Sequence, residues 1–294
     1  MPNNIALFKQ YVPLLDEVYK NASLTSVLDG NPELVRQGAN ANELIIPKMD
    51  MDGLGDYTRN SGYVDGDVTL TNETVICNFD RGRMFTVDAM DNIETAGIAF
   101  GQLSSEFIRT KVVPELDAFR LSTYAGKDGI GMGSKDITSG ELAVSELATA
   151  NDTMTEDEVP LENRFLFITP TIYGLIRDMD TTKSREIMKM FSSIIQVPQS
   201  RFVSAIEQLD GKTKTEGDDE TKGGYRKAAE AKNMNFMIVH REAVIQFEKH
   251  VAPKVITPEE NQTSDGWKFG YRNVGIADIY ENKAAGIYAH MAAK

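Results

Sequence analysis

The spacing of apolar residues along the chain predicts alternating strands and helices. The longest helical pattern covers residues 91–125, where apolar residues recur every three or four positions, and Pro114 predicts a kink within it. A second helix is expected over residues 141–150, and a third begins at Pro170, since proline suits the first turn of a helix. Because strands and helices are interleaved and then followed by strands alone, the pattern favours a mixed α+β fold.

Shorter apolar runs predict strands and the polar connections between them. The run RFLFIT at residues 164–169 predicts a buried strand, and residues 191–203 have a strand-like composition. Residues 209–228 are polar and rich in glycine, which predicts a mobile surface loop. Residues 234–291 are rich in strand-forming residues, whereas residues 1–30 predict a short amphipathic helix and a tether.

The most unusual pattern predicts a long hairpin between residues 43 and 88. One arm is the strand ELIIPKMDM at residues 43–51, in which Pro47 favours a sheet edge or a bulge, and the other arm covers residues 68–87. The segment between them is full of Gly, Asp and Asn, which are turn residues. Because a two-stranded ribbon with few large apolar residues is marginally stable alone, we expect it to contact another subunit.

Composition and charge exclude several classes of protein. Lys and Arg number 31 and Asp and Glu 44, so the 294-residue chain has a net charge of −13, which disfavours tight binding to a nucleic-acid backbone. No apolar run is long enough to span a bilayer. The first 30 residues lack the pattern of a signal peptide, so we expect synthesis in a cytoplasm.

The candidate chemical groups of the sequence point to packing. His240, His250 and His290 lack metal-site spacing and a partner for catalysis, so ordinary packing is expected for each of them. The single cysteine, Cys77, excludes an intramolecular disulfide and a cysteine-based zinc site, and is expected to be a small buried hydrophobe. The sequence therefore predicts neither a catalytic residue, nor a metal site, nor a cofactor.

Three short motifs imitate ligand sites without completing them. Three glycines resemble a nucleotide-binding loop but follow a helix, which favours a flexible helix exit; they are Gly129, Gly131 and Gly133. Four residues match the first half of a calcium loop, but Leu54 and Ser61 break the match, so a solvated turn is expected; they are Asp50, Asp52, Gly55 and Asp56. Alternating aromatic residues are expected to pack on one face of a sheet; they are Trp267, Phe269 and Tyr271.

The order of several segments resembles one known family. The segments are VPLLDEVYKNASLTSVLD, IPKMDMDGLGDYTRNSGY, DRGRMFTVDAMD, VVPELDAFRL, VPLENRFLFITP, VPQSRF and DGWKFGYRNVGIADIYENKAAGIYAH. Together they resemble the major capsid (coat) proteins of tailed bacteriophages with the Hong Kong 97-like fold, especially those of phages and prophages of Gram-positive bacteria. The resemblance covers nearly the whole chain and includes no catalytic motif.

The resemblance implies an α+β fold with four named parts. These are an N-arm (1–35), an extended E-loop hairpin (36–80), a P-domain (81–138, with the spine helix at 91–125) and an A-domain (139–249, with the mobile loop at 209–228). Residues 250–294 would return strands to the P-domain and end in an A-domain strand. The implied function is an icosahedral shell of hexamers and pentamers around double-stranded DNA, assembled in the host bacterial cytoplasm.

The resemblance also implies partners and contact residues. The implied partners are other copies of the chain, a portal protein, a separate scaffolding protein (since the chain begins near the arm), a decoration protein, and packaged DNA through weak contacts. Candidate inter-subunit ion pairs involve Asp56, Arg59, Asp65, Asp80, Arg81 and Arg83. Some relatives crosslink a hairpin lysine to an asparagine, for which the candidates are Lys48, Asn273 and Asn282.

Three other hypotheses stay open at this point. An encapsulin-like nanocompartment shell would share the fold and assemble without a portal or a scaffold. A phage tail component would form rings or tubes instead of closed shells. An enzyme with a mixed α+β fold would need a polar pocket with perturbed titratable groups, and the sequence shows no such cluster.

Overall fold

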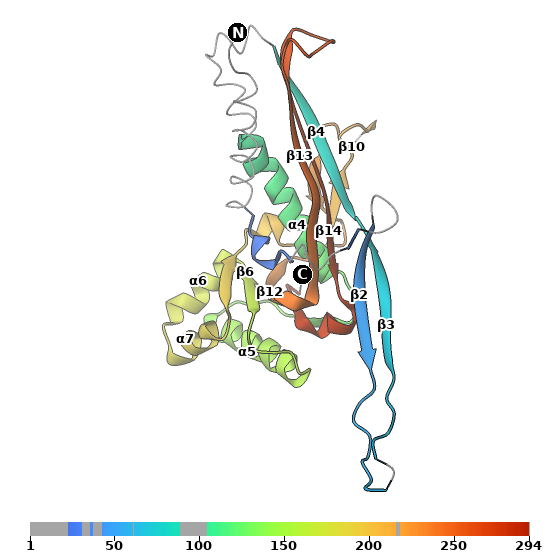
Figure 1. Cartoon of the computed structure of the whole chain (residues 1–294). Helices are drawn as coiled ribbons and strands as arrows, with labels where there is room; N and C mark the ends of the chain where they lie inside the picture. Colours follow the sequence, from blue (N-terminus) through green and yellow to red (C-terminus); the bar gives the residue numbers. More distant parts are fainter. Residues whose placement is uncertain are drawn as a thin grey trace, which may run out of the picture.

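A computed structural model gives the arrangement of the chain. It describes residues 23–30, 36–37, 43–60, 62–88, 105–215 and 218–293. The molecule is elongated, with a long twisted sheet reaching one end and a two-stranded hairpin reaching the other (Figure 1). The mixed α+β class predicted from the sequence is confirmed. The helix expected near the N-terminus lies outside the described residues.

The longest strands form a three-stranded antiparallel sheet in the order β13-β14-β4. The strands are β4 (Phe79–Asp88), β13 (Val244–Ile256) and β14 (Gly266–Ile279). On the central strand, Phe269 and Tyr271 are buried in one apolar cluster, and Trp267 packs against it. The predicted packing of these alternating aromatic residues on one face of a sheet is therefore confirmed.

A helical segment packs against this sheet and completes the cluster. It consists of the π-helix η3 (Ile108–Val112) followed by α4 (Val113–Ala125). Pro114 is the second residue of α4, and its missing N–H leaves the carbonyl of Thr110 without its α-helical donor. The predicted disturbance at Pro114 thus takes the form of a π-helix immediately before it. The first part of the expected helix, residues 91–104, lies outside the described residues.

A second, five-stranded sheet has the order β5-β15-β12-β6-β7 and carries three helices. Its strands are β5 (Gly131–Ser134), β6 (Arg164–Ile168), β7 (Ser193–Gln196), β12 (Met234–His240) and β15 (Ile287–Met291). Its helices are α5 (Gly140–Glu156), α6 (Pro170–Met179) and α7 (Thr182–Lys189). All seven residues of β12 are buried, as in a strand covered on both faces.

Two predictions near this sheet are corrected. Gly131 and Gly133 are residues of strand β5, which pairs with β15, and do not form a flexible helix exit. Position 131 requires glycine because a Cβ there would lie 2.5 Å from the ring of Tyr288. The strand-like stretch 191–203 holds β7, the short 3-10 helix η4 (Gln199–Arg201), which follows Pro198, and a single β-bridge from Val203 to Asn233.

The expected mobile loop at residues 209–228 contains short strands. Strand β8 (Ile206–Leu209) pairs with β11 (Gly224–Lys227), and β9 (Lys214–Thr215) pairs with β10 (Asp218–Asp219). Gly211 and Gly223 have positive φ angles of 73° and 63°, which explains why this glycine-rich stretch turns so tightly. Short strands therefore lie within the stretch that the sequence predicts to be a mobile surface loop, and its mobility stays a prediction.

The expected second arm of the hairpin divides into two strands of different sheets. Strand β3 (Val68–Ile76) pairs with β2 (Glu43–Met51), whose other edge carries the two-residue β1 (Arg36–Gln37), whereas β4 pairs with β14. Asn78 lies at the division. Its side chain donates to the carbonyl of Ala277 at 2.7 Å and accepts from the N–H of Ala277 at 3.1 Å, so an amide side chain replaces the backbone ladder there.

The segment at residues 23–30, with the 3-10 helix η1 (Ser26–Leu28), is held by a buried carboxylate on α4. Asp117 accepts hydrogen bonds from the Ser23 hydroxyl (2.9 Å), the Thr25 hydroxyl (2.8 Å) and the backbone N–H groups of Leu24 and Thr25 (3.1 and 3.2 Å). Arg201 lies 3.5 Å from the same carboxylate. The short 3-10 helices η5 (Arg241–Ala243) and η6 (Glu281–Gly286) complete the described elements.

Candidate functional site

The hairpin of β2 and β3 has an uncovered apolar face. The register places Met49 opposite Leu70 and Met51 opposite Val68, so these four side chains share one face. They are 57% to 65% exposed. We call these four residues the apolar ladder. A row of large apolar side chains at this exposure is typical of an interaction surface.

The same hairpin is anchored to the body through its other face. Val75 is buried in a cluster with Ile245 and Ile276, and the half-buried Cys77 packs against that cluster. Burial raises the pKa of the Cys77 thiol, so it stays protonated at neutral pH, as suits an unreactive packing residue. The base of the hairpin is therefore fixed, while its far half projects into solvent (Figure 1).

The tip of the hairpin, residues 52–67, is acidic and aromatic. Tyr57 and Tyr63 are 60% and 88% exposed, and their ring centroids lie 4.9 Å apart. Three of the predicted inter-subunit contact residues lie here and are exposed; they are Asp56, Arg59 and Asp65. The half-match to a calcium loop does not gather a ligand set. Among the residues that the structure describes, no group of three or more His, Cys, Asp or Glu could hold a metal ion.

The other three predicted contact residues make ion pairs or hydrogen bonds within this chain. Asp80 accepts from Arg272 through both oxygens, at 2.8 and 2.6 Å. Arg81 donates to Glu115 (2.8 Å) and to the carbonyls of Leu209 (2.7 Å) and Gly224 (3.1 Å). Their role between subunits stays a prediction, and the structure adds a role inside the subunit.

Arg83 completes this set of arginine contacts. It donates to the carbonyls of Thr221 and Lys222, both at 3.1 Å. Together Arg81 and Arg83 tie the β8–β11 extension to strand β4 and to α4. Burial raises the pKa of Glu115 against the opposing effect of Arg81 beside it, so the pair sits in a partly dehydrated setting.

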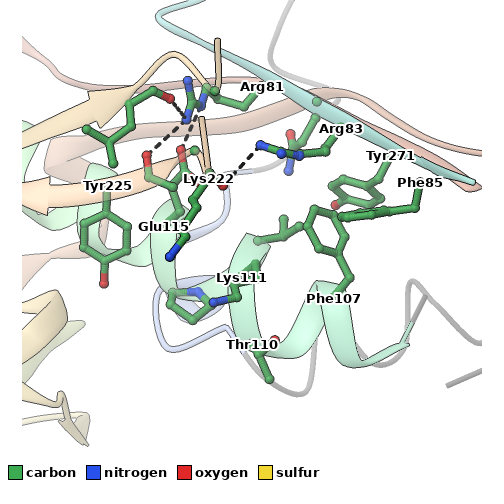
Figure 2. Close-up of a pocket in the computed structure, with 18 of the residues that line it drawn as sticks. Arg81, Arg83, Phe85, Phe107, Thr110, Lys111, Glu115, Lys222, Tyr225 and Tyr271 are labelled. Carbon is green, nitrogen blue, oxygen red and sulfur yellow. Dashed lines mark hydrogen bonds and ion pairs between the residues drawn. The ribbon is translucent and has the colours of Figure 1, made fainter. Parts of the chain in front are cut away.

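A cavity of about 1050 Å³ lies between β4, η3–α4 and the β8–β11 extension (Figure 2). Its apolar wall includes Phe85 and Phe107, whose ring centroids lie 4.8 Å apart in an edge-to-face arrangement, with Tyr271 beside them. Lys111 contributes from the helical side and Lys222 from the extension. The cavity is therefore large and partly aromatic, and its lining holds both positively and negatively charged side chains.

Asn273 lines the same cavity and is the least satisfied polar side chain there. It is 1% exposed, and neither its Nδ2 nor its Oδ1 has a hydrogen-bond partner among the described residues. A buried amide without partners costs free energy, so the position calls for an explanation. Of the other crosslink candidates, Lys48 pairs with Thr71 in the hairpin ladder and Asn282 is exposed in η6.

The histidines behave as packing residues where their side chains are described. His290 is fully buried, stacks on Phe236 with ring centroids 4.7 Å apart, and shares a 3.0 Å hydrogen bond with Asn235. Its Nε2 lies 3.5 Å from Glu146. His240 is also buried. The side chain of His250 lies outside the described residues.

Lowering the pH is expected to destabilise the folded subunit through these histidines. Burial lowers the pKa of His290 and of His240, so below the unfolded pKa of about 6.5 the unfolded chain binds protons that the folded chain does not. Stability is fully present well above that pH and declines as the pH falls through it towards the lower pKa values of the folded chain. Thermal melts across this range check it, and a His290→Gln variant with an unchanged decline would contradict the assignment to His290.

Most of the residues that line the cavity could not be predicted from the sequence. Lys111, Glu115 and Lys222 carry no motif, and more than a hundred positions separate Lys222 from the other two residues, which line the same cavity. One signal was available, since Arg81, Arg83 and Phe85 alternate along a strand and therefore share a face. No described helix is long and apolar enough to cross a membrane.

Comparison with known proteins identifies the fold. No family model and no curated protein matches the sequence. A chain of Gordonia phage Cozz matches with a TM-score of 0.59 and 10% identity, covering 93% of this chain and 87% of that one. The capsid of Staphylococcus phage Andhra matches with a TM-score of 0.56 and 11% identity, over 90% and 84% of the two chains.

A virus-like particle is similar to the same extent. The particle from Pyrococcus furiosus matches with a TM-score of 0.56 and 10% identity, covering 97% of this chain and 100% of that one. At such identities the likeness extends to the fold alone. Because these matches span nearly whole chains, the protein has the fold of phage capsid proteins.

Proposed function

We propose that the protein is the major capsid protein of a tailed phage, which assembles into an icosahedral shell around double-stranded DNA. The observation that carries the proposal is the apolar ladder of Met49, Met51, Val68 and Leu70, which the chain itself leaves uncovered. The capsid fold and the projecting hairpin, which has one uncovered apolar face, support a subunit whose apolar ladder is buried by neighbouring copies.

The parts of the Hong Kong 97-like fold are assigned to the described elements. The hairpin of β2 and β3 serves as the E-loop, and the three-stranded sheet with η3–α4 serves as the P-domain with its spine helix. The five-stranded sheet with α5–α7 serves as the A-domain. Because β5 pairs with β15, we place residues 131–134 in the A-domain as well. Residues 1–35 form the proposed N-arm.

The proposal includes partners and a place of action. Copies of the chain form hexamers and pentamers, with a portal protein, a separate scaffolding protein and a decoration protein as further partners. Assembly takes place in the host bacterial cytoplasm, and the product is the virion capsid. The net charge of −13 supports weak, non-specific contact with the packaged DNA, since an acidic inner wall leaves the genome free to move. The role is structural, with no catalytic residue assigned.

Electron microscopy of assembled material tests the proposal. We expect closed shells of uniform diameter when the protein is produced together with the products of its neighbouring genes, because many modest contacts add up in a closed symmetric assembly. Production of the chain alone is the control. A well-behaved monomer or dimer under both conditions would contradict the shell function and reopen the enzyme hypothesis, and open rings or tubes would indicate a tail component.

The second candidate function is a nanocompartment shell of the encapsulin-like kind. The match to the Pyrococcus furiosus virus-like particle, which covers all of that chain, favours it as the alternative. Such a shell assembles without scaffold or portal. Closed shells from the chain alone would therefore favour the nanocompartment, whereas a requirement for a scaffolding gene would favour the phage capsid.

A further inference from the structure

We infer that four residues form an acid-sensitive clasp that holds the edge strand β5 to the five-stranded sheet. The clasp consists of His290 on β15, Asn235 on β12, Glu146 on α5 and Lys135, which directly follows β5. Protonation of His290 opens the clasp and loosens β5. The inference goes beyond the proposed function, because it concerns one sheet of the subunit and holds whether or not the chain forms shells.

The hydrogen bonds of Asn235 determine where neutral His290 carries its proton. The Nδ2 of Asn235 donates to the backbone carbonyl of Lys135 at 2.9 Å, which fixes the orientation of the amide. The same Nδ2 lies 3.0 Å from Nδ1 of His290, so it donates its second hydrogen to that ring nitrogen. Nδ1 is therefore an acceptor, and the neutral imidazole carries its proton on Nε2.

The other ring nitrogen faces a carboxylate. Nε2 of His290 lies 3.5 Å from Oε2 of Glu146, which is longer than an ordinary hydrogen bond. Oε1 of Glu146 accepts a 2.8 Å hydrogen bond from the ammonium group of Lys135, and this bond lowers the pKa of Glu146. The carboxylate thus stays ionised in the pH range where a histidine titrates.

The remaining surroundings of the ring are uncharged. Phe236 of β12 stacks on it with ring centroids 4.7 Å apart, and a Cβ at Gly133 of β5 would lie 2.8 Å from Cδ2 of the ring. The hydroxyl of Tyr288 lies at the same distance from that point, and burial raises its pKa, so it stays neutral. Glu146 and Lys135 are therefore the charged groups that face His290 among the described residues.

A second proton on the ring of His290 breaks this arrangement. It would have to occupy Nδ1, toward which the amide of Asn235 already points a hydrogen. Turning the amide over would offer its oxygen to Nδ1 but would also set that oxygen against the carbonyl oxygen of Lys135. In either case one buried hydrogen bond is lost, which is costly. Because Lys135 follows β5 and its N–H donates to the carbonyl of Met291 at 3.1 Å, its displacement loosens the end of that strand.

Burial and the facing carboxylate act on the protonated ring in opposite directions, and burial prevails. His290 is fully buried, which lowers its pKa, whereas Glu146 raises that pKa by less. An open clasp exposes the ring, whose pKa then returns toward about 6.5. The open state therefore binds the proton more tightly. Its population rises by up to about tenfold for each pH unit below about 6.5, until the lower pKa of the closed state is reached.

Hydrogen–deuterium exchange of the unassembled full-length chain tests the clasp. After correction for the intrinsic pH dependence of amide exchange, protection of residues 131–135 is expected to fall by about three- to tenfold between about pH 7.5 and about pH 5.5. Strand β6, which lies on the far side of β12 in the same sheet, should keep its protection. Unchanged protection of residues 131–135, or an equal fall in β6, would overturn the clasp.

Two substitutions separate the clasp from other effects of acid. His290→Gln removes the titrating group, so the fall in protection of residues 131–135 should disappear. The matched control, His240→Gln, changes another buried histidine at the opposite end of β12 from Asn235, and should show the same fall as the natural chain. Each variant is compared with itself at the two pH values, so a difference in overall stability does not affect the result. A persisting fall in His290→Gln, or its loss in His240→Gln, would overturn the assignment to His290.

Nitrogen-15 NMR of the histidine side chains tests the position of the proton independently of stability. The signals of His290 are those that disappear in His290→Gln. At about pH 7.5 we expect a protonated Nε2 and an unprotonated Nδ1 for this residue. A proton on Nδ1 would overturn the inference, because further protonation would then take place at Nε2, beside Glu146, without disturbing Asn235.

Discussion

Shell assembly is expected to be lost when the apolar ladder is made polar by the combined changes Met49→Gln, Met51→Gln, Val68→Thr and Leu70→Thr. Each side chain is more than half exposed in the subunit and gains about 1 kcal/mol when a neighbour covers it. The combined loss of about 4 kcal/mol for each hairpin corresponds to about a thousandfold in each contact equilibrium. Sedimentation and electron microscopy of the particles measure the effect.

The subunit itself should tolerate these changes. Because the ladder side chains are exposed, the melting temperature of the unassembled variant is expected to stay close to that of the natural chain. A matched control changes Thr69 and Thr71, which alternate onto the opposite face of the same strand, to glutamine. Normal shells from the ladder variant, or loss of shells from the control, would contradict the assignment of this face as the contact.

The second large effect is expected within the subunit, at Asp117. Replacing it with alanine removes the acceptor for four hydrogen bonds from residues 23–25 and the negative charge that lies 3.5 Å from Arg201. Loss of one partner from a buried charged network typically costs about 3–5 kcal/mol. In a chain of this size that corresponds to a fall in melting temperature of about 10 °C.

Thermal or urea unfolding of the unassembled chain measures this prediction. Asp152→Ala, the same change at an exposed position of α5, is the control and should shift stability by less than about 0.5 kcal/mol. Equal melting temperatures for Asp117→Ala and the natural chain would show that residues 23–30 are not held by this carboxylate. Release of that segment alone, without loss of the core, would appear as new protease cleavage near residue 25.

The elements predicted best from the sequence are those whose own residues decide the structure. Strand β2 matches residues 43–51 and β6 lies within residues 164–169, because apolar and β-branched runs bounded by turn residues form strands in most settings. Helix α6 begins at Pro170 as expected. Where the composition predicts the wrong local structure, tertiary contacts determine it. In β5, for example, the ring of Tyr288 leaves no room for a Cβ at Gly131.

The candidate site could be predicted only in part. The hairpin was accessible because its residues are adjacent in sequence and visibly lack a core of their own. The cavity was not, because Arg81 and Arg83 bind backbone carbonyls of a loop more than 120 positions away, and a carbonyl carries no sequence signal. The unsatisfied state of Asn273 likewise depends on what surrounds it in three dimensions.

The division of one continuous strand pattern at Asn78 has a mechanical consequence. Strands β3 and β4 follow each other directly but belong to separate sheets, so the direction of the hairpin is set at a two-residue joint, residues 77 and 78, and not by an unbroken ladder. Because Val75 is buried at the base of the hairpin and Asn78 holds the joint through two hydrogen bonds to Ala277, the hairpin leaves the body in one defined direction.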